Sequence, residues 1–124
     1  MSIYQMTDAQ LLKLAATAFD DANLVESSMG AGWTYWIGFC EELYCDVTRA
    51  WDPLSDDGDA LRLAVKLRLQ VVMHANWVEV LQGGIRMANA TSEYFAGCMF
   101  ATARAAITRA AAESQRRKDE EGDQ

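Results

Sequence analysis

The chain has 124 residues, of which 51% are hydrophobic, and it carries a formal net charge of −7 at pH 7. This length supports one domain with a single core, and the negative charge repels a phosphate backbone, which argues against direct binding to DNA or RNA. No apolar run approaches the ~18 residues that cross a bilayer and no signal segment opens the sequence, so we expect a cytoplasmic protein without membrane contact.

The first predicted element is a helix from Thr7 to Asp20. Thr7 followed by Gln10 forms a capping box, in which each side chain accepts a hydrogen bond from the other residue's backbone N–H. The apolar residues behind this box recur with the period of one helix face, at Leu11, Leu14, Ala15, Ala18 and Phe19. Residues 22–32 then carry the small and flexible residues of a loop.

A strand is predicted at residues 33–39, which alternate in side-chain type. The residues on one face are Trp33, Tyr35, Ile37 and Phe39. Trp36 points to the opposite face, so the strand is either covered on both faces or partly exposed. An exposed aromatic strand is a natural protein-binding surface, because Trp and Tyr supply much of the energy at interfaces. Burial in the core is the alternative, because large aromatic side chains are usually buried.

Residues 41–50 have two interpretations. Their alternation predicts a second strand paired with residues 33–39. A short helix from Cys40 to Tyr44 is the competing prediction. The functional interpretation is the same for both.

The segment WDPLSDDGDALRLAVKL, residues 51–67, predicts a turn followed by a helix. Pro53 fixes its own φ and biases Asp52 away from helical backbone, so the helix begins after this pair. Ser55, Asp56 or Asp57 can supply the N-cap oxygen. The apolar stripe of this helix is predicted to consist of Leu61, Ala64, Val65 and Leu67.

The same segment has an acidic cluster around Gly58, made of Asp52, Asp56, Asp57 and Asp59. An EF-hand with Gly58 at its invariant glycine would place Pro53 at the first ligand position and Ala64 at the last, so this site type is excluded. Helix capping and solvation are the favoured roles of these aspartates. A hydrated Mg²⁺ held by them is the alternative.

The segment WDP followed by DDGDALRLAVKL resembles a segment of small bacteriophage and prophage accessory proteins of unknown function, the NinX-like group. A second similar stretch is ARAAITRAAAE, residues 103–113. The resemblance carries no catalytic motif and implies a phage accessory role in a bacterial host. Residues 24–50 depart from it, being richer in aromatic residues and cysteine. The matching positions are Trp51, Pro53, Asp57, Asp59, Ala60, Leu61, Arg62 and Leu67.

Residues 68–82 alternate in the manner of a β-hairpin whose turn contains Asn76, a residue that tolerates left-handed backbone. A pair of glycines then offers a second turn into a third strand at residues 85–87. His74 lies beside the first turn, and no motif places a Ser, Cys or acid to work with it. We therefore expect His74 to be exposed or hydrogen-bonded and not a catalytic base.

The last predicted element is a long helix from Ser92 to Gln115, capped by Thr91 or Ser92. Its apolar stripe consists of Phe95, Cys98, Met99, Thr102, Ala106, Ile107 and Ala110. Core packing is the first explanation of this stripe, and the seam of a homodimer is the second. From Glu113 onward the chain is dense in charge, so we expect the helix to fray into a solvated tail.

The cysteines Cys40, Cys45 and Cys98 are odd in number, which predicts reduced and buried thiols. Four residues separate Cys40 from Cys45, a spacing that zinc allows. Only His74 and Cys98 could complete such a site, and they form no second ligand pair. We therefore predict no zinc site and no cofactor.

Together these elements predict a single α+β domain over residues 1–115, followed by a charged solvated tail over residues 116–124. A mostly antiparallel sheet containing a β-meander is packed by an N-terminal helix, a short central helix and a long C-terminal helix.

Two functional hypotheses follow. The first is a non-enzymatic phage accessory protein that binds a host or phage protein, such as a host defence or regulatory factor. Its acidic charge suits docking on a basic surface. The predicted partner-binding residues are Trp33, Tyr35, Trp36, Asp52, Asp56 and Asp57. The second hypothesis is a small Mg²⁺-dependent hydrolase or ligand-binding protein that uses the acidic loop 52–59.

Overall fold

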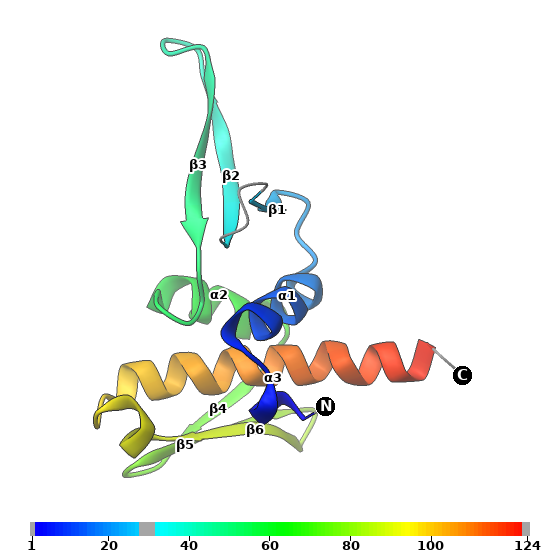
Figure 1. The fold of residues 1–124 in the computed structure, drawn as a ribbon, viewed down its shortest axis with the longest axis vertical. Coiled ribbons are helices and arrows are strands. Elements are labelled where there is room, and N and C mark those ends of the chain that lie inside the picture. The colour runs from blue at the N-terminus through cyan, green and yellow to red at the C-terminus, as the bar shows by residue number, and fades with distance from the viewer. Residues whose placement is uncertain (1, 28–31, 123–124) are drawn as a thin grey trace.

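The long C-terminal helix α3 (Met99–Gly122) lies between two layers in the computed structural model, which describes residues 2–27 and 32–122 (Figure 1). Helices α1 (Asp8–Phe19) and α2 (Asp57–Lys66) pack on one side of α3. A three-stranded antiparallel sheet packs on the other side, formed by β4 (Gln70–Met73), β5 (Trp77–Gln82) and β6 (Ile85–Thr91). The predicted α+β class is confirmed.

This sandwiched position explains the composition of α3. Its small side chains let both layers approach the helix axis closely, so the helix is buried on more than the single predicted stripe. The additional buried residues are Ala103, Ala105, Thr108, Ala111, Ala112 and Glu113. The predicted stripe, except for the exposed Cys98, is thus used for packing within the chain, which is the first of the two explanations of its pattern.

Both ends of α3 differ from the prediction. A 3₁₀ turn η2 (Ser92–Phe95) comes first, and Ala96 in left-handed backbone, with φ 53°, separates it from the helix. At the other end the helix continues past Gln115 to Gly122. Arg116 pairs with Glu113 and with Glu120 across successive turns, and such pairs stabilise a charged helix end.

Glu113 is the buried carboxylate of this helix end. Burial alone would raise the pKa of Glu113, but hydrogen bonds from Arg116 and Arg117 outweigh burial and hold the pKa below its ordinary value. Glu113 is therefore a paired ion inside the body.

The N-terminal helix is as predicted. Thr7 accepts a hydrogen bond from the Gln10 backbone N–H at 3.2 Å, and Gln10 accepts one from the Thr7 N–H at 2.9 Å. The buried side chains of α1 are Leu11, Ala15, Ala16 and Phe19. They pack this helix onto the core.

The predicted stripe of α2 is wrong in two positions. Leu61 and Val65 are 63% and 68% exposed. Asp56 caps the helix. Asp59 is buried and accepts a hydrogen bond from the Asp52 backbone N–H, so the side of α2 that carries Asp59 faces the core. The face that follows Asp59 in helical register is therefore the buried one, and it contains Ala60, Leu63 and Ala64.

The meander is confirmed, and its third strand is longer than predicted, extending to Thr91. His74 beside the first turn stacks on Trp77, with ring centroids 4.0 Å apart, and bonds Glu79 at 3.0 Å. The hydrogen bond from His74, together with Arg86, lowers the pKa of Glu79. His74 is therefore hydrogen-bonded, as expected.

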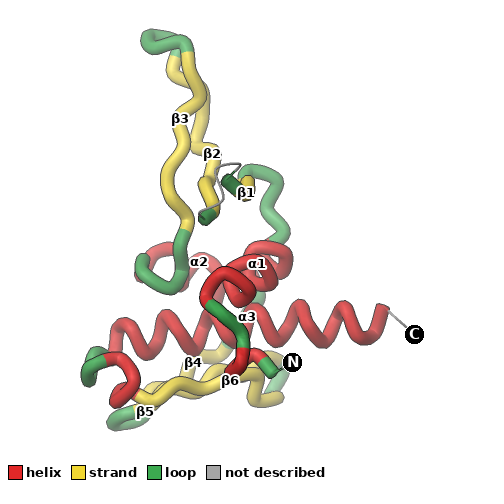
Figure 2. Tube along the Cα trace, in the orientation of Figure 1, coloured by secondary structure: helices red, strands yellow, loops and turns green. Residues whose placement is uncertain are grey.

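A second antiparallel sheet stands apart from the first, in the order β1 (Leu24–Glu26), β2 (Trp33–Cys40) and β3 (Cys45–Trp51). Residues 41–50 thus contain a strand, and the competing helix is wrong. The short strand β1 lies in the segment predicted as a loop, of which residues 28–31 are outside the described part. Figure 2 shows the β2–β3 hairpin extending well beyond the helices.

Candidate functional site

The β2–β3 hairpin, called the arm from here on, projects away from the helices (Figure 1). Large apolar side chains are exposed along its length. Soluble proteins rarely leave contiguous apolar surface uncovered unless it contacts a partner. The exposed large apolar residues are Trp36, Ile37, Phe39, Leu43, Tyr44 and Val47. The arm is therefore the first candidate functional surface.

Aromatic contacts order the side chains of the arm. The Trp36 indole N–H donates to Asp46 across the strands at 3.1 Å. Phe39 and Tyr44 meet edge to face, with ring centroids 5.5 Å apart. A break in strand register between Trp36 and Gly38 interrupts the alternation, and such bulges change the direction of side chains.

The base of the arm is fixed to the body. Trp51 at the end of β3 is 2% exposed and packs against Phe19 of α1, with ring centroids 5.7 Å apart. Arg49 of β3 bonds the buried carboxylate of Asp59 in α2 at 2.7 Å. Asp59 also accepts the Asp52 backbone N–H at 3.0 Å. The apolar surface of the arm is consequently presented from a firm base.

Two of the predicted aromatic residues belong to this base. Trp33 and Tyr35 are half-buried and pack against the core. The Tyr35 hydroxyl donates to Asp21 at 2.9 Å, and Arg49 lies over the Tyr35 ring at 5.3 Å. They therefore support the arm, whereas Trp36 is part of its exposed surface.

The predicted acidic residues have local partners. Asp52 accepts hydrogen bonds from the Leu54 N–H and the Ser55 hydroxyl. Asp56 caps α2 through the Asp59 N–H at 2.8 Å. Asp57, which is 63% exposed, pairs with Arg104 of α3 at 2.6 Å. Capping and pairing within the chain therefore account for the acidic loop.

The structure does not gather the six predicted residues into one patch. Trp33, Tyr35 and Asp52 hold the base of the arm, Trp36 lies on the arm itself, and Asp56 and Asp57 lie at the start of α2. In the described ranges 2–27 and 32–122, no group of three or more His, Cys, Asp or Glu side chains is placed to hold a metal ion.

Sequence reasoning missed the outer part of the arm. Ile37 and Phe39 are 57% and 51% exposed, and Leu43 and Tyr44 at the tip are 75% and 84% exposed. One signal was available in the sequence. Residues 33–39 carry apolar side chains on both faces of the strand, and a strand at the edge of a small domain has only one face on the core, so the other face is left exposed. The predicted pairing of residues 33–39 with residues 41–50 implies a hairpin, but no pattern indicated that it projects from the body or that residues 41–44 form its tip.

The cysteines also differ from the prediction. Cys45 and Cys98 are exposed, and Cys40 is half-buried, so the expectation of buried thiols is wrong. Cys40 and Cys45 are directly opposite each other in the hairpin register. Cys45 is exposed because the arm projects from the core.

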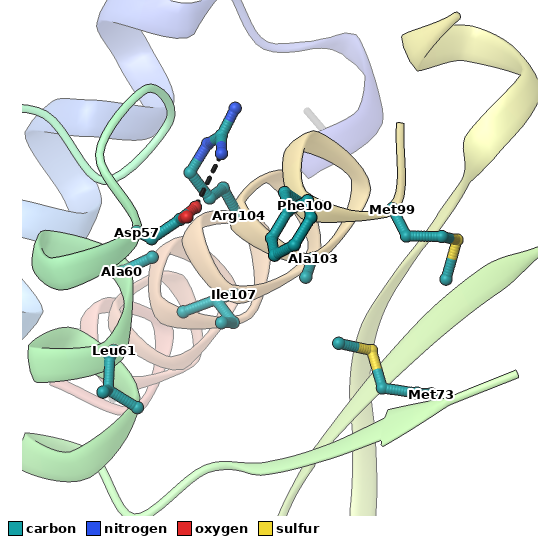
Figure 3. A pocket seen from close by; sticks show the side chains of 9 residues that line it. All are labelled: Asp57, Ala60, Leu61, Met73, Met99, Phe100, Ala103, Arg104 and Ile107. Atoms are coloured by element: carbon teal, nitrogen blue, oxygen red, sulfur yellow. Dashed lines mark hydrogen bonds and ion pairs between the residues drawn. The ribbon is translucent and has the colours of Figure 1, made fainter. Parts of the chain in front are cut away.

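A second feature is an apolar groove of about 430 Å³ between α2, β4 and α3 (Figure 3). The Arg104–Asp57 ion pair lies at one end, and Met73 and Met99 lie at the other. Leu61 and Phe100, which are 63% and 71% exposed, line it between these ends. Leu61 lines this groove because it lies on the side of α2 that faces away from the core.

Comparisons of the chain with protein-family models, curated proteins and solved structures give no match. The NinX-like resemblance of residues 51–67 accordingly stays a prediction. Within the described residues, no helix is both long and apolar enough to span a membrane.

Proposed function

We propose that this protein is a non-enzymatic binding protein whose arm contacts another protein. The observation that carries the proposal is the exposed apolar surface on the arm, which includes Trp36, Ile37 and Phe39. A few residues supply most of the binding energy at protein interfaces, and exposed aromatic side chains such as Trp36 are frequent among them. The resemblance of residues 51–67 to phage accessory proteins is the reason to expect a host or phage protein as the partner.

The rigid base supports this proposal. Binding orders fewer degrees of freedom when the contacting surface is already held in place, and the lower entropic cost increases affinity. The Arg49–Asp59 ion pair and the buried Trp51 hold the arm on α2 and α1. A partner would therefore meet a largely formed surface.

The acidic loop has less support as a catalytic site. A Mg²⁺ ion would have to compete with Arg104 for Asp57 and with the helix N-terminus for Asp56. Asp59 is 1% exposed and bonded to Arg49 and Arg62. The interactions of these aspartates favour a structural role.

The test is capture from a nuclease-treated bacterial lysate with two matched variants. One replaces Ile37 and Phe39 by Ser on the arm, and the other replaces Leu61 and Val65 by Ser on α2, where the exposed fractions are similar. We expect the wild type and the α2 variant to retain one stoichiometric partner and the arm variant to lose it, with all three proteins folded by circular dichroism.

Retention of the partner by the arm variant would overturn the proposal. Its loss from the α2 variant alone would move the binding site to the apolar groove beside Leu61.

A further inference from the structure

A second groove, of about 500 Å³, lies where the end of α2, the β5–β6 turn and the last turns of α3 meet. Its volume is in the range of ordinary ligand sites. Its lining combines cations with apolar side chains and includes Lys66, Arg68, Arg117, Lys118, Ile85 and Met87. We call it the basic groove.

The cations of this groove are unusual in an acidic protein, because most basic side chains elsewhere have partners. Among the residues that the structure describes, four lysine and arginine side chains make no hydrogen bond or ion pair, and three of them are Lys66, Arg68 and Lys118. Arg117 in the same groove bonds Glu113 at 3.1 Å. One acid, Glu121, also lines the groove. The groove thus concentrates positive charge that the described part of the chain does not neutralise.

The tip of the arm has the complementary chemistry. Glu41 and Glu42 are adjacent, exposed and without a hydrogen bond or ion pair in the described ranges. They are followed by Leu43 and Tyr44, which are 75% and 84% exposed. Two carboxylates next to two apolar side chains match a groove whose cations lie beside apolar walls.

The tip cannot reach the groove of its own chain. The arm rises from the side of α3 that carries α1 and α2, whereas the β5–β6 turn of the groove lies on the opposite side of α3 (Figure 1). We propose that the basic groove binds the hairpin tip of a second copy of this chain. In a dimer with a twofold axis, the tip of each copy lies in the groove of the other, so both tips and both grooves are occupied, as in an isologous interface.

This inference concerns the charged tip and the groove, so it stands independently of the partner that we propose for the apolar faces of the arm. Its test is a reciprocal charge reversal. The tip variant replaces Glu41 and Glu42 by Lys, and the groove variant replaces Lys66 and Lys118 by Glu. In each variant alone, tip and groove carry like charges and repel each other. In a mixture, each tip meets a groove of opposite charge.

We expect the wild type to form dimers in analytical ultracentrifugation and each variant to dimerise at least about tenfold more weakly. We expect an equimolar mixture of the two variants to form a one-to-one pair. Lys13→Glu, a reversal at an exposed cation outside the groove, serves as the control and should dimerise like the wild type. Thermal unfolding verifies that every variant is folded.

Three results would each overturn the proposal. The first is a monomeric wild type at every concentration reached. The second is dimerisation that only the groove variant weakens, which would assign the groove to another acidic segment. The third is a mixture of folded variants that does not associate.

Discussion

Replacing Asp59 by Asn will measure how firmly the arm is held on α2. The Asp59 carboxylate accepts hydrogen bonds from Arg49 at 2.7 Å, from the Asp52 N–H at 3.0 Å and from Arg62 at 3.3 Å. The side chain of Asp59 is 1% exposed, so water cannot replace these bonds on the carboxylate side. The Asn side chain keeps the shape, removes the charge and turns one acceptor into a donor.

The expected cost follows from these contacts. Breaking a buried ion pair costs about 3–5 kcal/mol, because the remaining charge loses its partner. The Arg49 side chain is 33% exposed, so water recovers part of that cost. We therefore expect Asp59→Asn to lower the free energy of unfolding by about 2–3 kcal/mol. At ~4 °C per kcal/mol for a domain of this size, Tm falls by about 8–12 °C.

Urea denaturation and calorimetry measure this loss, and Asp57→Asn is the matched control. Asp57 also pairs with an arginine but is 63% exposed, so its replacement should cost no more than about 1 kcal/mol. Equal losses for the two variants would refute the reasoning, because burial would then make no difference to the strength of the pair.

Further predictions concern packing, pH and thiol chemistry. Leu63→Ala, at a site that is 0% exposed, should cost about 3 kcal/mol in urea denaturation, whereas Leu61→Ala should cost less than about 0.5 kcal/mol; equal costs would contradict the observed rotation of α2. The lowered pKa of Glu113 contributes stability that is fully present above its ordinary pKa of about 4.3 and is lost as pH falls through the lowered value. Glu113→Gln should therefore be less stable than the wild type at neutral pH, and the difference should shrink below about pH 4.3 in pH-dependent unfolding; a constant difference would contradict it. Mild oxidation with diamide should join Cys40 to Cys45, which are opposite each other in the hairpin, and leave one thiol for Ellman's reagent; three remaining thiols would show that the pair cannot close.

Local sequence patterns predicted an element correctly where residues close together in the chain determine its backbone conformation. The capping box at Thr7 begins α1, and the Asp56 cap begins α2, within the set of predicted caps. The alternation of residues 68–82 and the paired glycines predicted the meander, which the strand pairing confirms. These signals depend on residues within a few positions of one another, so they can be read without knowledge of the packing.

The functional surface was only partly predictable. Trp36 was named as a contact residue and is exposed on the arm, whereas Trp33 and Tyr35 support its base. A strand with apolar side chains on both faces looks the same in sequence whether it is covered or projecting. The exposed residues Leu43 and Tyr44 at the tip belong to residues 41–50, whose alternation predicted a strand and gave no sign of an exposed turn at residues 41–44.

The sequence by itself determined the α+β class, the order of most elements and the caps that begin the helices, because these follow from local propensity and hydrophobic period. Only the tertiary structure decided which side of α2 is buried, because the partners of Asp59 lie before that helix in the chain. It also separated the strands into two sheets, enclosed α3 between two layers and left the arm uncovered. These outcomes depend on contacts between distant residues, which no local pattern encodes.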